Sequence, residues 1–241
     1  MPRAYASYRL LWTALDWVFP PHCAGCGRPG IRWCEECQAR VQRIDGEICP
    51  RCGNPQSSSR PCAACRAESP SFECLRSWAV FDGPVREAIH RLKYKRDMGA
   101  GETLAVQTLP LVRDLRWPVD LVAPIPLSKR RQSERGYNQA GLIARPLALA
   151  LGIQYAPHAV SRWRETRSQV GLTGEQRRQN VRGAFRVEGA QVRGRCILLI
   201  DDVATTGSTL SSASEALLAA GAGKVYAFTL ARAPDPRHAA P

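Results

Sequence analysis

The stretch that decides the fold is Ile197-Leu-Leu-Ile-Asp201-Asp-Val-Ala-Thr205-Thr-Gly-Ser-Thr-Leu210. Its leading apolar run is typical of a buried strand, and helical spacing resumes only after Ser208. Between the two lies an acidic pair, followed by a loop of small and hydroxyl-bearing residues. This order predicts a strand, a turn and a helix.

The chemistry of this loop favours a phosphorylated sugar. Small side chains let backbone N–H groups approach a phosphate, and the start of the following helix adds unpaired N–H groups with positive potential. The two carboxylates beside the loop suit sugar hydroxyls or Mg²⁺. A P-loop is excluded, because the lysine of that motif is missing. An ordinary strand–turn–helix with an acidic turn is the alternative.

The composition of the whole chain favours anionic partners without choosing among them. The 241 residues allow one large domain or two smaller ones, and 34 Lys plus Arg against 21 Asp plus Glu give a formal net charge of +13. Phosphosugars, nucleic acid and acidic membrane surfaces all suit that charge. We recognise no signal peptide, and the apolar stretch 10–19 is too short for a transmembrane segment. We therefore expect a cytoplasmic protein.

Eight of the ten cysteines form four Cys-x-x-Cys pairs between residues 23 and 65. Two intervening residues let one tight turn direct both thiolates at one metal ion, and four thiolates specify Zn²⁺ in a closed structural site. A redox role is disfavoured, because the segment has almost no core of its own. Pairing in sequence order predicts two structural zinc ions in a double zinc ribbon at 23–70, with interleaved pairing as the alternative. The predicted ligand sets are Cys23, Cys26, Cys34 and Cys37, and Cys49, Cys52, Cys62 and Cys65.

Residues 1–22 are predicted to form an amphipathic helix that ends before Pro20-Pro21. The apolar side chains from Tyr5 to Phe19 fall on one face at helical spacing. We expect this face to dock on the protein's own domain, because the polar face lacks the Lys/Arg stripe of a membrane-binding helix. Association with a membrane surface or a partner is the alternative.

The remainder, 71–241, alternates strand and helix patterns, which predicts an α/β domain with a mainly parallel sheet flanked by helices. Strands are expected at 75–81, 119–125 and 225–230, beside the one at 197–200. A helix that opens at Gly83-Pro84 carries a basic face, which fits a phosphate patch and a solvated surface equally well. That face comprises Arg86, His90, Arg91, Lys93, Lys95 and Arg96.

Two further basic segments are predicted to complete the anion site. One follows the strand 119–125 and carries Lys129, Arg130 and Arg135; ligands of open α/β sheets sit beyond the carboxyl ends of strands. The other, 161–186, holds seven arginines, with no clear strand and a weak helical pattern. We interpret it as an arginine-rich lid that neutralises a leaving pyrophosphate, with a mobile basic loop as the alternative.

In combination, these features resemble the ComF/GntX family, competence protein F-like homologues with a phosphoribosyltransferase domain behind a double zinc ribbon. The resemblance covers nearly the whole chain. Beyond the cysteine pairs and the acidic loop, it rests on Pro124-Ile-Pro126, Arg135-Gly-Tyr-Asn-Gln139 and the runs 164–172 and 177–185. Tyr137 stands where the family usually has Phe.

The resemblance implies a type I phosphoribosyltransferase-like fold that binds phosphoribosyl pyrophosphate (PRPP) with Mg²⁺. The acidic pair would meet the ribose hydroxyls and Mg²⁺, and Lys129, Arg130 and Arg135 would face the pyrophosphate. Gln169 and Arg177 are the lid candidates, and no catalytic residue is identified. The implied PRPP-binding set is Asp201, Asp202, Val203, Ala204, Thr205, Thr206, Gly207, Ser208 and Thr209.

Two functions are compatible with this resemblance. The first is a Mg²⁺-dependent phosphoribosyltransferase with an unidentified acceptor, linked to DNA uptake in natural competence. The second is a non-catalytic accessory protein that senses PRPP or binds single-stranded DNA, beside a helicase-like competence protein. The sequence shows no residue that reads a nucleobase, so it leaves the acceptor open.

Overall fold

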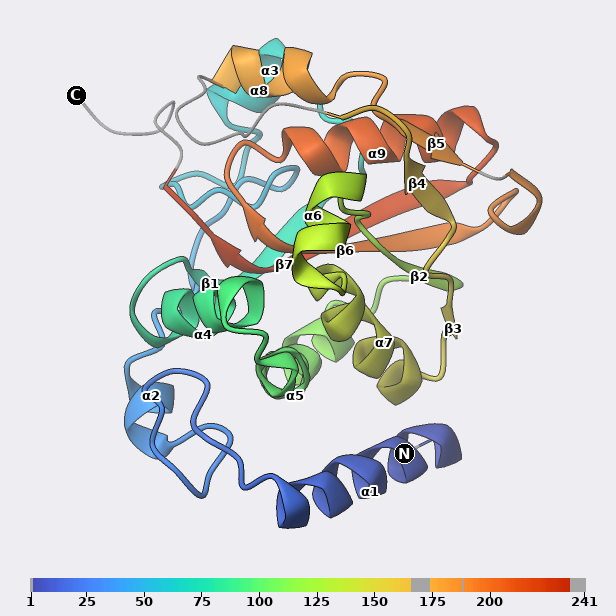
Figure 1. The fold of residues 1–241 in the computed structure, drawn as a ribbon. Helices are drawn as coiled ribbons and strands as arrows, with labels where there is room; N and C mark the ends of the chain where they lie inside the picture. Colours follow the sequence, from blue (N-terminus) through green and yellow to red (C-terminus); the bar gives the residue numbers. More distant parts are fainter. Residues whose placement is uncertain (1, 166–173, 188, 235–241) are drawn as a thin grey trace.

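A five-stranded parallel sheet forms the centre of the computed structural model, which describes residues 2–165, 174–187 and 189–234 (Figure 1). The strand order is β1-β7-β6-β2-β3, so β6 is central. Ile197 of β6 aligns with Leu121 of β2 and with Val225 of β7. The bounds are β1 Leu75–Val80, β2 Leu121–Pro124, β3 Gln154–Tyr155, β6 Cys196–Ala204 and β7 Lys224–Arg232.

Helices cover both faces of this sheet, which explains why the start of β6 is a continuous apolar run. Alternate residues of the strand enter two different cores: Leu198 and Ile200 pack with one set of helices, Ile197 and Leu199 with the other. The first face is covered by α4 (Gly83–Tyr94), α5 (Met98–Asp114) and α7 (Gln139–Leu151), the second by α9 (Ser208–Ala219). The predicted α/β class, mainly parallel with flanking helices, is confirmed.

Several elements depart from the sequence prediction. Helix α5 was not predicted at all. The segment 161–186 was expected to lack strands, and this is wrong at both of its ends, because β4 (Val160–Arg162) and β5 (Phe185–Val187) form an antiparallel pair. Short strands of this kind carry too few residues for a recognisable alternation. Between them, α8 (Gly174–Val181) matches the weak helical pattern.

The N-terminal helix α1 (Arg3–Val18) docks on the protein through only part of its apolar face. Tyr5 is buried, and Tyr8 packs against the same core. Leu11 and Val18, in contrast, are 66% and 69% exposed, so the prediction that the apolar face docks is wrong for the second half of the helix. None of the described helices is long and apolar enough to cross a membrane.

The cysteine-rich segment is joined to the free edge of the sheet. The linker between its two halves pairs with edge strand β1: Val80 N donates to Gln42 O at 2.8 Å, and Arg43 forms an antiparallel bridge with Ala79. Each half contains one short helix, α2 (Glu35–Ala39) and α3 (Ala63–Ala67). The remaining described elements are α6 (Lys129–Arg135) and the 3₁₀ turn η1 (Gly189–Gln191).

Candidate functional site

The acidic pair lies inside strand β6 rather than in a turn. The strand continues to Ala204, and Asp201 aligns with Thr229 of β7. The prediction that the strand ends before the pair is therefore wrong, because sheet pairing continues past the last apolar residue. Asp202 is only 4% exposed, and its backbone N–H donates to Asp201 Oδ1 at 2.8 Å. The strand therefore holds both carboxylates at its carboxyl end.

Lys93 provides the cation that faces this pair. Its Nζ lies 2.8 Å from Asp202 Oδ1, and the side chains are 19% and 6% exposed. The other oxygen, Oδ2, is buried and has no hydrogen-bond partner among the described residues. A buried carboxylate oxygen without a partner is costly, so this atom is suited to receive a ligand hydroxyl or a metal ion. From the sequence, the basic face of the helix that carries Lys93, α4, fits a phosphate patch and a solvated surface equally well.

Burial and mutual repulsion raise the pKa of Asp201 to about 7, although Lys93 and Arg162 oppose the shift. Arg162 lies on β4, and its guanidinium stacks over the ring of Phe185, with 5.6 Å from Cζ to the centroid. Burial and the nearby charge of Arg131 lower the pKa of Arg162. One strand residue of the predicted lid segment is thus close enough for its charge to act on the acidic pair.

The loop after β6 has the features of a phosphate cradle. Gly207 takes a φ of +74° directly before α9 and, as the N-cap residue, gives this helix no side-chain cap, while the Ser208 N–H donates to Thr206 Oγ1 at 3.3 Å. The hydroxyls of Thr206 and Ser208 lie 2.6 Å apart. A helix start with glycine at the N-cap and small residues beside it suits a phosphate, because it offers backbone N–H groups and the positive end of the helix dipole.

The predicted pyrophosphate segment forms helix α6 and the turn after it. Lys129 and Arg130 are exposed, and Arg130 Nε lies 3.1 Å from Glu134 Oε1. Arg135 donates to Gln139 Oε1 at 2.7 Å and stacks over the ring of Tyr94 at 5.5 Å. No described contact joins Lys129, Arg130 or Arg135 to the acidic pair, so their role toward a pyrophosphate stays a prediction.

The lid candidates cannot be placed in the same way. Gln169 lies outside the described residues, and so does the side chain of Arg177. The backbone of α8 packs on α9, where Ser212 Oγ donates to Val181 O at 2.7 Å. Arg164 fastens the other end of the segment by donating to Arg182 O at 2.6 Å.

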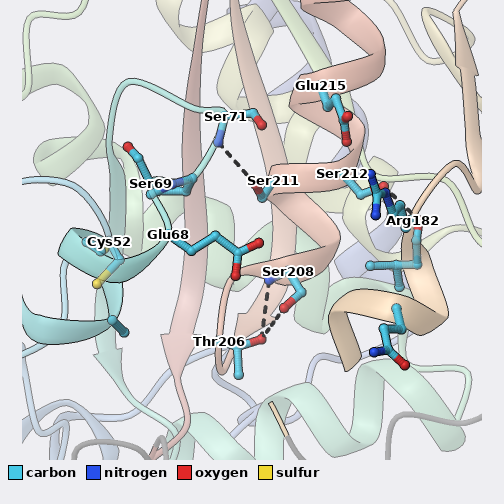
Figure 2. A pocket seen from close by; sticks show the side chains of 15 residues that line it. Cys52, Glu68, Ser69, Ser71, Arg182, Thr206, Ser208, Ser211, Ser212 and Glu215 are labelled. Carbon is cyan, nitrogen blue, oxygen red and sulfur yellow. Dashed lines mark hydrogen bonds between the residues drawn. The ribbon is translucent and has the colours of Figure 1, made fainter. Parts of the chain in front are cut away.

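A polar cavity of about 470 Å³ borders the loop on the side of the cysteine-rich segment. Figure 2 shows its wall of hydroxyls and carboxylates, with the Thr206–Ser208 contact at the base of α9. Ser71 N donates to Ser211 Oγ at 3.0 Å and thereby ties the chain before β1 to α9. The cavity shares Thr206 and Ser208 with the loop, whereas the acidic pair is not part of its lining.

The cysteines form two clusters in sequence order. In each cluster the four Sγ atoms lie within 4.8 Å of one another. Separations of 3.6 to 3.7 Å match the edge of a tetrahedron with Zn–S bonds of about 2.3 Å, which is about 3.8 Å. They are measured for Cys23–Cys34, Cys23–Cys37, Cys26–Cys34 and Cys52–Cys62. The donor sets therefore fit structural Zn²⁺.

The second cluster is fixed to the sheet by two close contacts. Arg232, at the end of β7, is 4% exposed and donates to Cys52 O at 2.6 Å. Gly53 has a φ of +67°, and a Cβ at this position would lie 2.4 Å from Leu75 O. Only glycine allows that approach of two backbones. The sequence had predicted the thiolate pairs but not these contacts.

Known proteins resemble both the cysteine-rich segment and the sheet domain of this chain. The family profile described as "Double zinc ribbon domain" matches residues 14–66. The "DNA utilization protein YhgH" of Escherichia coli K12 is 36% identical over 205 residues, which is 83% of this chain and 89% of that protein. The "Competence protein F" of Haemophilus influenzae is 33% identical, covering 88% and 96%. The "Competence protein ComFC" of Bacillus subtilis is 31% identical, covering 85% and 86%.

Solved structures resemble this chain only distantly. An adenine phosphoribosyltransferase has a TM-score of 0.34 and 17% identity, covering 56% of this chain and 72% of its own. A "glutamine phosphoribosylpyrophosphate (PRPP) amidotransferase" from B. subtilis has a TM-score of 0.38 and 21% identity, covering 54% and 26%. Scores this low support no argument about the site. The curated relatives are much closer, and on their identity and coverage the chain belongs to the ComF family of competence protein F homologues.

Proposed function

We propose that this protein binds PRPP together with Mg²⁺ at the carboxyl end of β6 and acts in DNA uptake or utilisation. The observation that carries the proposal is the buried carboxylate of Asp202. One of its oxygens pairs with Lys93, the other has no partner among the described residues, and a helix with glycine at its N-cap begins six residues later. The DNA-related role is taken from the names of the relatives.

Each part of the ligand has a matching group in this arrangement. Asp201 and Asp202 suit the ribose hydroxyls and a divalent cation, and the loop 205–209 suits the 5′-phosphate through its backbone N–H groups. Arg162 supplies a second positive charge that acts on the acidic pair. Lys129, Arg130 and Arg135 are proposed to face the pyrophosphate, and Gln169 and Arg177 to belong to a lid.

If the protein transfers the ribosyl group, its residues act by positioning and by charge. Pyrophosphate leaves as positive charge builds up at the anomeric carbon, so fixed cations stabilise the leaving group, and the ionised acidic pair stabilises the sugar. A bound Mg²⁺ would supply further charge neutralisation on the pyrophosphate oxygens. No nucleophilic side chain is required for this chemistry.

The ligand assignment is tested by equilibrium dialysis of the zinc-loaded protein. We expect PRPP to be retained when Mg²⁺ is present, and ribose 5-phosphate and pyrophosphate to be retained much more weakly, because each fills only half of the site. Equal retention of all three compounds would overturn the assignment and leave a general anion site.

The alternative is a binding protein that does not turn PRPP over and acts on DNA as an accessory. The net charge of +13 supports contact with single-stranded DNA or with a partner that carries it. Pyrophosphate release from PRPP is the measurement that separates the two, made over a panel of nitrogenous acceptors with and without single-stranded DNA. Release with any acceptor identifies a transferase; PRPP binding without release under every condition identifies a sensor. We further propose that the protein works in the cytoplasm.

A further inference from the structure

The ion pair between Lys93 and Asp202 has a consequence for how the site takes up its ligand. The lysine ammonium occupies Oδ1 of a carboxylate that the proposed function assigns to the metal and the ribose. We propose that Lys93 is a built-in counter-cation: it opposes binding of a divalent cation alone and favours binding of the cation with PRPP. This inference rests on the proposed function of the site.

Lys93 is held in place by the helix that carries it. Helix α4 is anchored by Val85, Ile89 and Leu92, which are all fully buried against the sheet. Lys93 lies in the last turn of the helix, and its side chain is 19% exposed, so the ammonium approaches Asp202 from a fixed direction. It does not reach the carboxylate as a flexible surface lysine would.

The same helix turn is fastened to the predicted pyrophosphate segment on both sides of Lys93. The hydroxyl of Tyr137 donates to Leu92 O, and the guanidinium of Arg135 stacks over the ring of Tyr94 at 5.5 Å. The residue before Lys93 therefore contacts the turn that follows α6, and the residue after it contacts the last residue of α6. This places the lysine between the acidic pair and the segment proposed to face the pyrophosphate.

An ammonium in this position has two roles, which depend on what else is bound. It carries three N–H donors, and Asp202 is its one ion-pair partner among the described residues. Without PRPP, a divalent cation has to compete with this ammonium for Asp202. With PRPP, phosphate oxygens offer the ammonium new acceptors, and the carboxylate becomes available to the cation.

We expect Lys93 to couple the binding of the metal ion to the binding of PRPP. Because such coupling is reciprocal, PRPP raises the affinity for the metal as much as the metal raises the affinity for PRPP. Removing the lysine charge should therefore have opposite effects on the two affinities. The metal alone should bind more tightly, and PRPP at saturating metal should bind more weakly.

The test measures Mn²⁺ binding by electron paramagnetic resonance in the absence of PRPP, on the zinc-loaded protein. For Lys93→Met we expect an affinity for Mn²⁺ alone about tenfold higher than that of the wild type, since a charge-assisted hydrogen bond no longer competes. PRPP affinity at saturating Mg²⁺, measured by calorimetry, should fall about tenfold. Lys95→Met is the matched control, because Lys95 lies two residues away, is 56% exposed and pairs with Glu87 at 3.7 Å.

Each outcome decides the proposal. Unchanged or weaker binding of Mn²⁺ by Lys93→Met overturns it, and so does an equal gain in Lys95→Met. Lys93→Arg keeps the charge and should bind Mn²⁺ as the wild type does. If Lys93→Met fails to fold, Lys93→Gln takes its place, since it also removes the charge, and the same gain is expected. If the wild type binds no PRPP at all, the proposed function fails, while the Mn²⁺ comparison still judges whether Lys93 competes for Asp202.

Discussion

The two zinc clusters and the acidic site of β6 are built in opposite ways. Each zinc cluster takes its four ligands from a short stretch of chain, such as residues 23–37. The acidic site combines Asp202 of β6 with Lys93 of α4, which lies more than a hundred residues earlier in the chain. A local site, such as a zinc cluster, can be predicted from the spacing of its ligands in the sequence. An assembled site, such as the one at Asp202 and Lys93, depends on how the fold brings distant elements together.

The largest effect is expected from breaking the local site. Cys49→Ser should remove the second zinc ion and unfold the segment 49–65, because metal binding to such a site supplies roughly 10 kcal/mol of folding free energy. Elemental analysis should fall from two zinc ions per chain to one, and hydrogen exchange should rise across that segment. Cys74→Ser is the control, since Cys74 belongs to neither cluster; one zinc ion in the unmodified protein would refute the assignment.

The next largest effect is expected at the contact between the second zinc cluster and strand β1. Gly53→Ala should lower the free energy of unfolding by about 2–3 kcal/mol, because the new Cβ clashes with Leu75 O in a backbone conformation that favours glycine. Gly46→Ala is the matched control: its φ is +85°, and no atom of the described residues lies within 4 Å of the added Cβ. We expect a cost of about 1 kcal/mol there. Equal melting temperatures for the two variants would contradict the close approach.

A smaller effect concerns the pH dependence of the assembled site. Because the pKa of Asp201 is raised from its ordinary value to about 7, PRPP with Mg²⁺ should bind more tightly as the pH rises from 6 to 8, with an upper limit of about tenfold per pH unit. Binding should release protons, which calorimetry in buffers of different ionisation enthalpy detects. Folding stability should show the opposite sign and decrease between about pH 4 and 7, because the folded protein holds a proton that the unfolded chain has lost. Asp201→Asn should remove both trends.

The smallest effect is expected from the hydrogen bond between helix α4 and the turn after α6. Tyr137→Phe removes the hydroxyl that donates to Leu92 O, which should cost about 1 kcal/mol of stability. Tyr155→Phe loses only a 3.4 Å contact with Gly141 O and should cost less. Denaturant unfolding of the two variants makes the comparison. A larger loss in Tyr155→Phe would mean that the α4 contact contributes little.

The sequence predicted the parts of this molecule whose signal is local. The thiolate pairs indicated both zinc clusters, and the apolar run with its acidic pair indicated the central strand of an α/β sheet. It could not predict that the strand continues to Ala204, because pairing with β7 decides that end. Lys93 was visible only as one of several cations on a helix, and its role depends on the distance to Asp202.

Other features could not be predicted from the sequence for similar reasons. Arg162 was one of seven arginines in the segment 161–186, and only the structure shows that it lies on β4 and that its charge acts on Asp201. The exposed end of α1 was predicted to be docked, because helical spacing shows that a face is apolar but not how much of it is covered. Helix α5 has a buried polar residue, Glu102, that interrupts its apolar pattern.

Isothermal titration of PRPP in the presence of Mg²⁺ tests the central claim most directly. It compares the wild type with the double variant Asp201→Asn, Asp202→Asn, which keeps the shape of both side chains. We expect one PRPP per wild-type chain and a loss of at least about a hundredfold in affinity for the variant, since two charge-assisted contacts disappear. Zinc content should stay at two ions per chain. Equal affinity in both proteins would contradict the claim that the carboxyl end of β6 is the PRPP site.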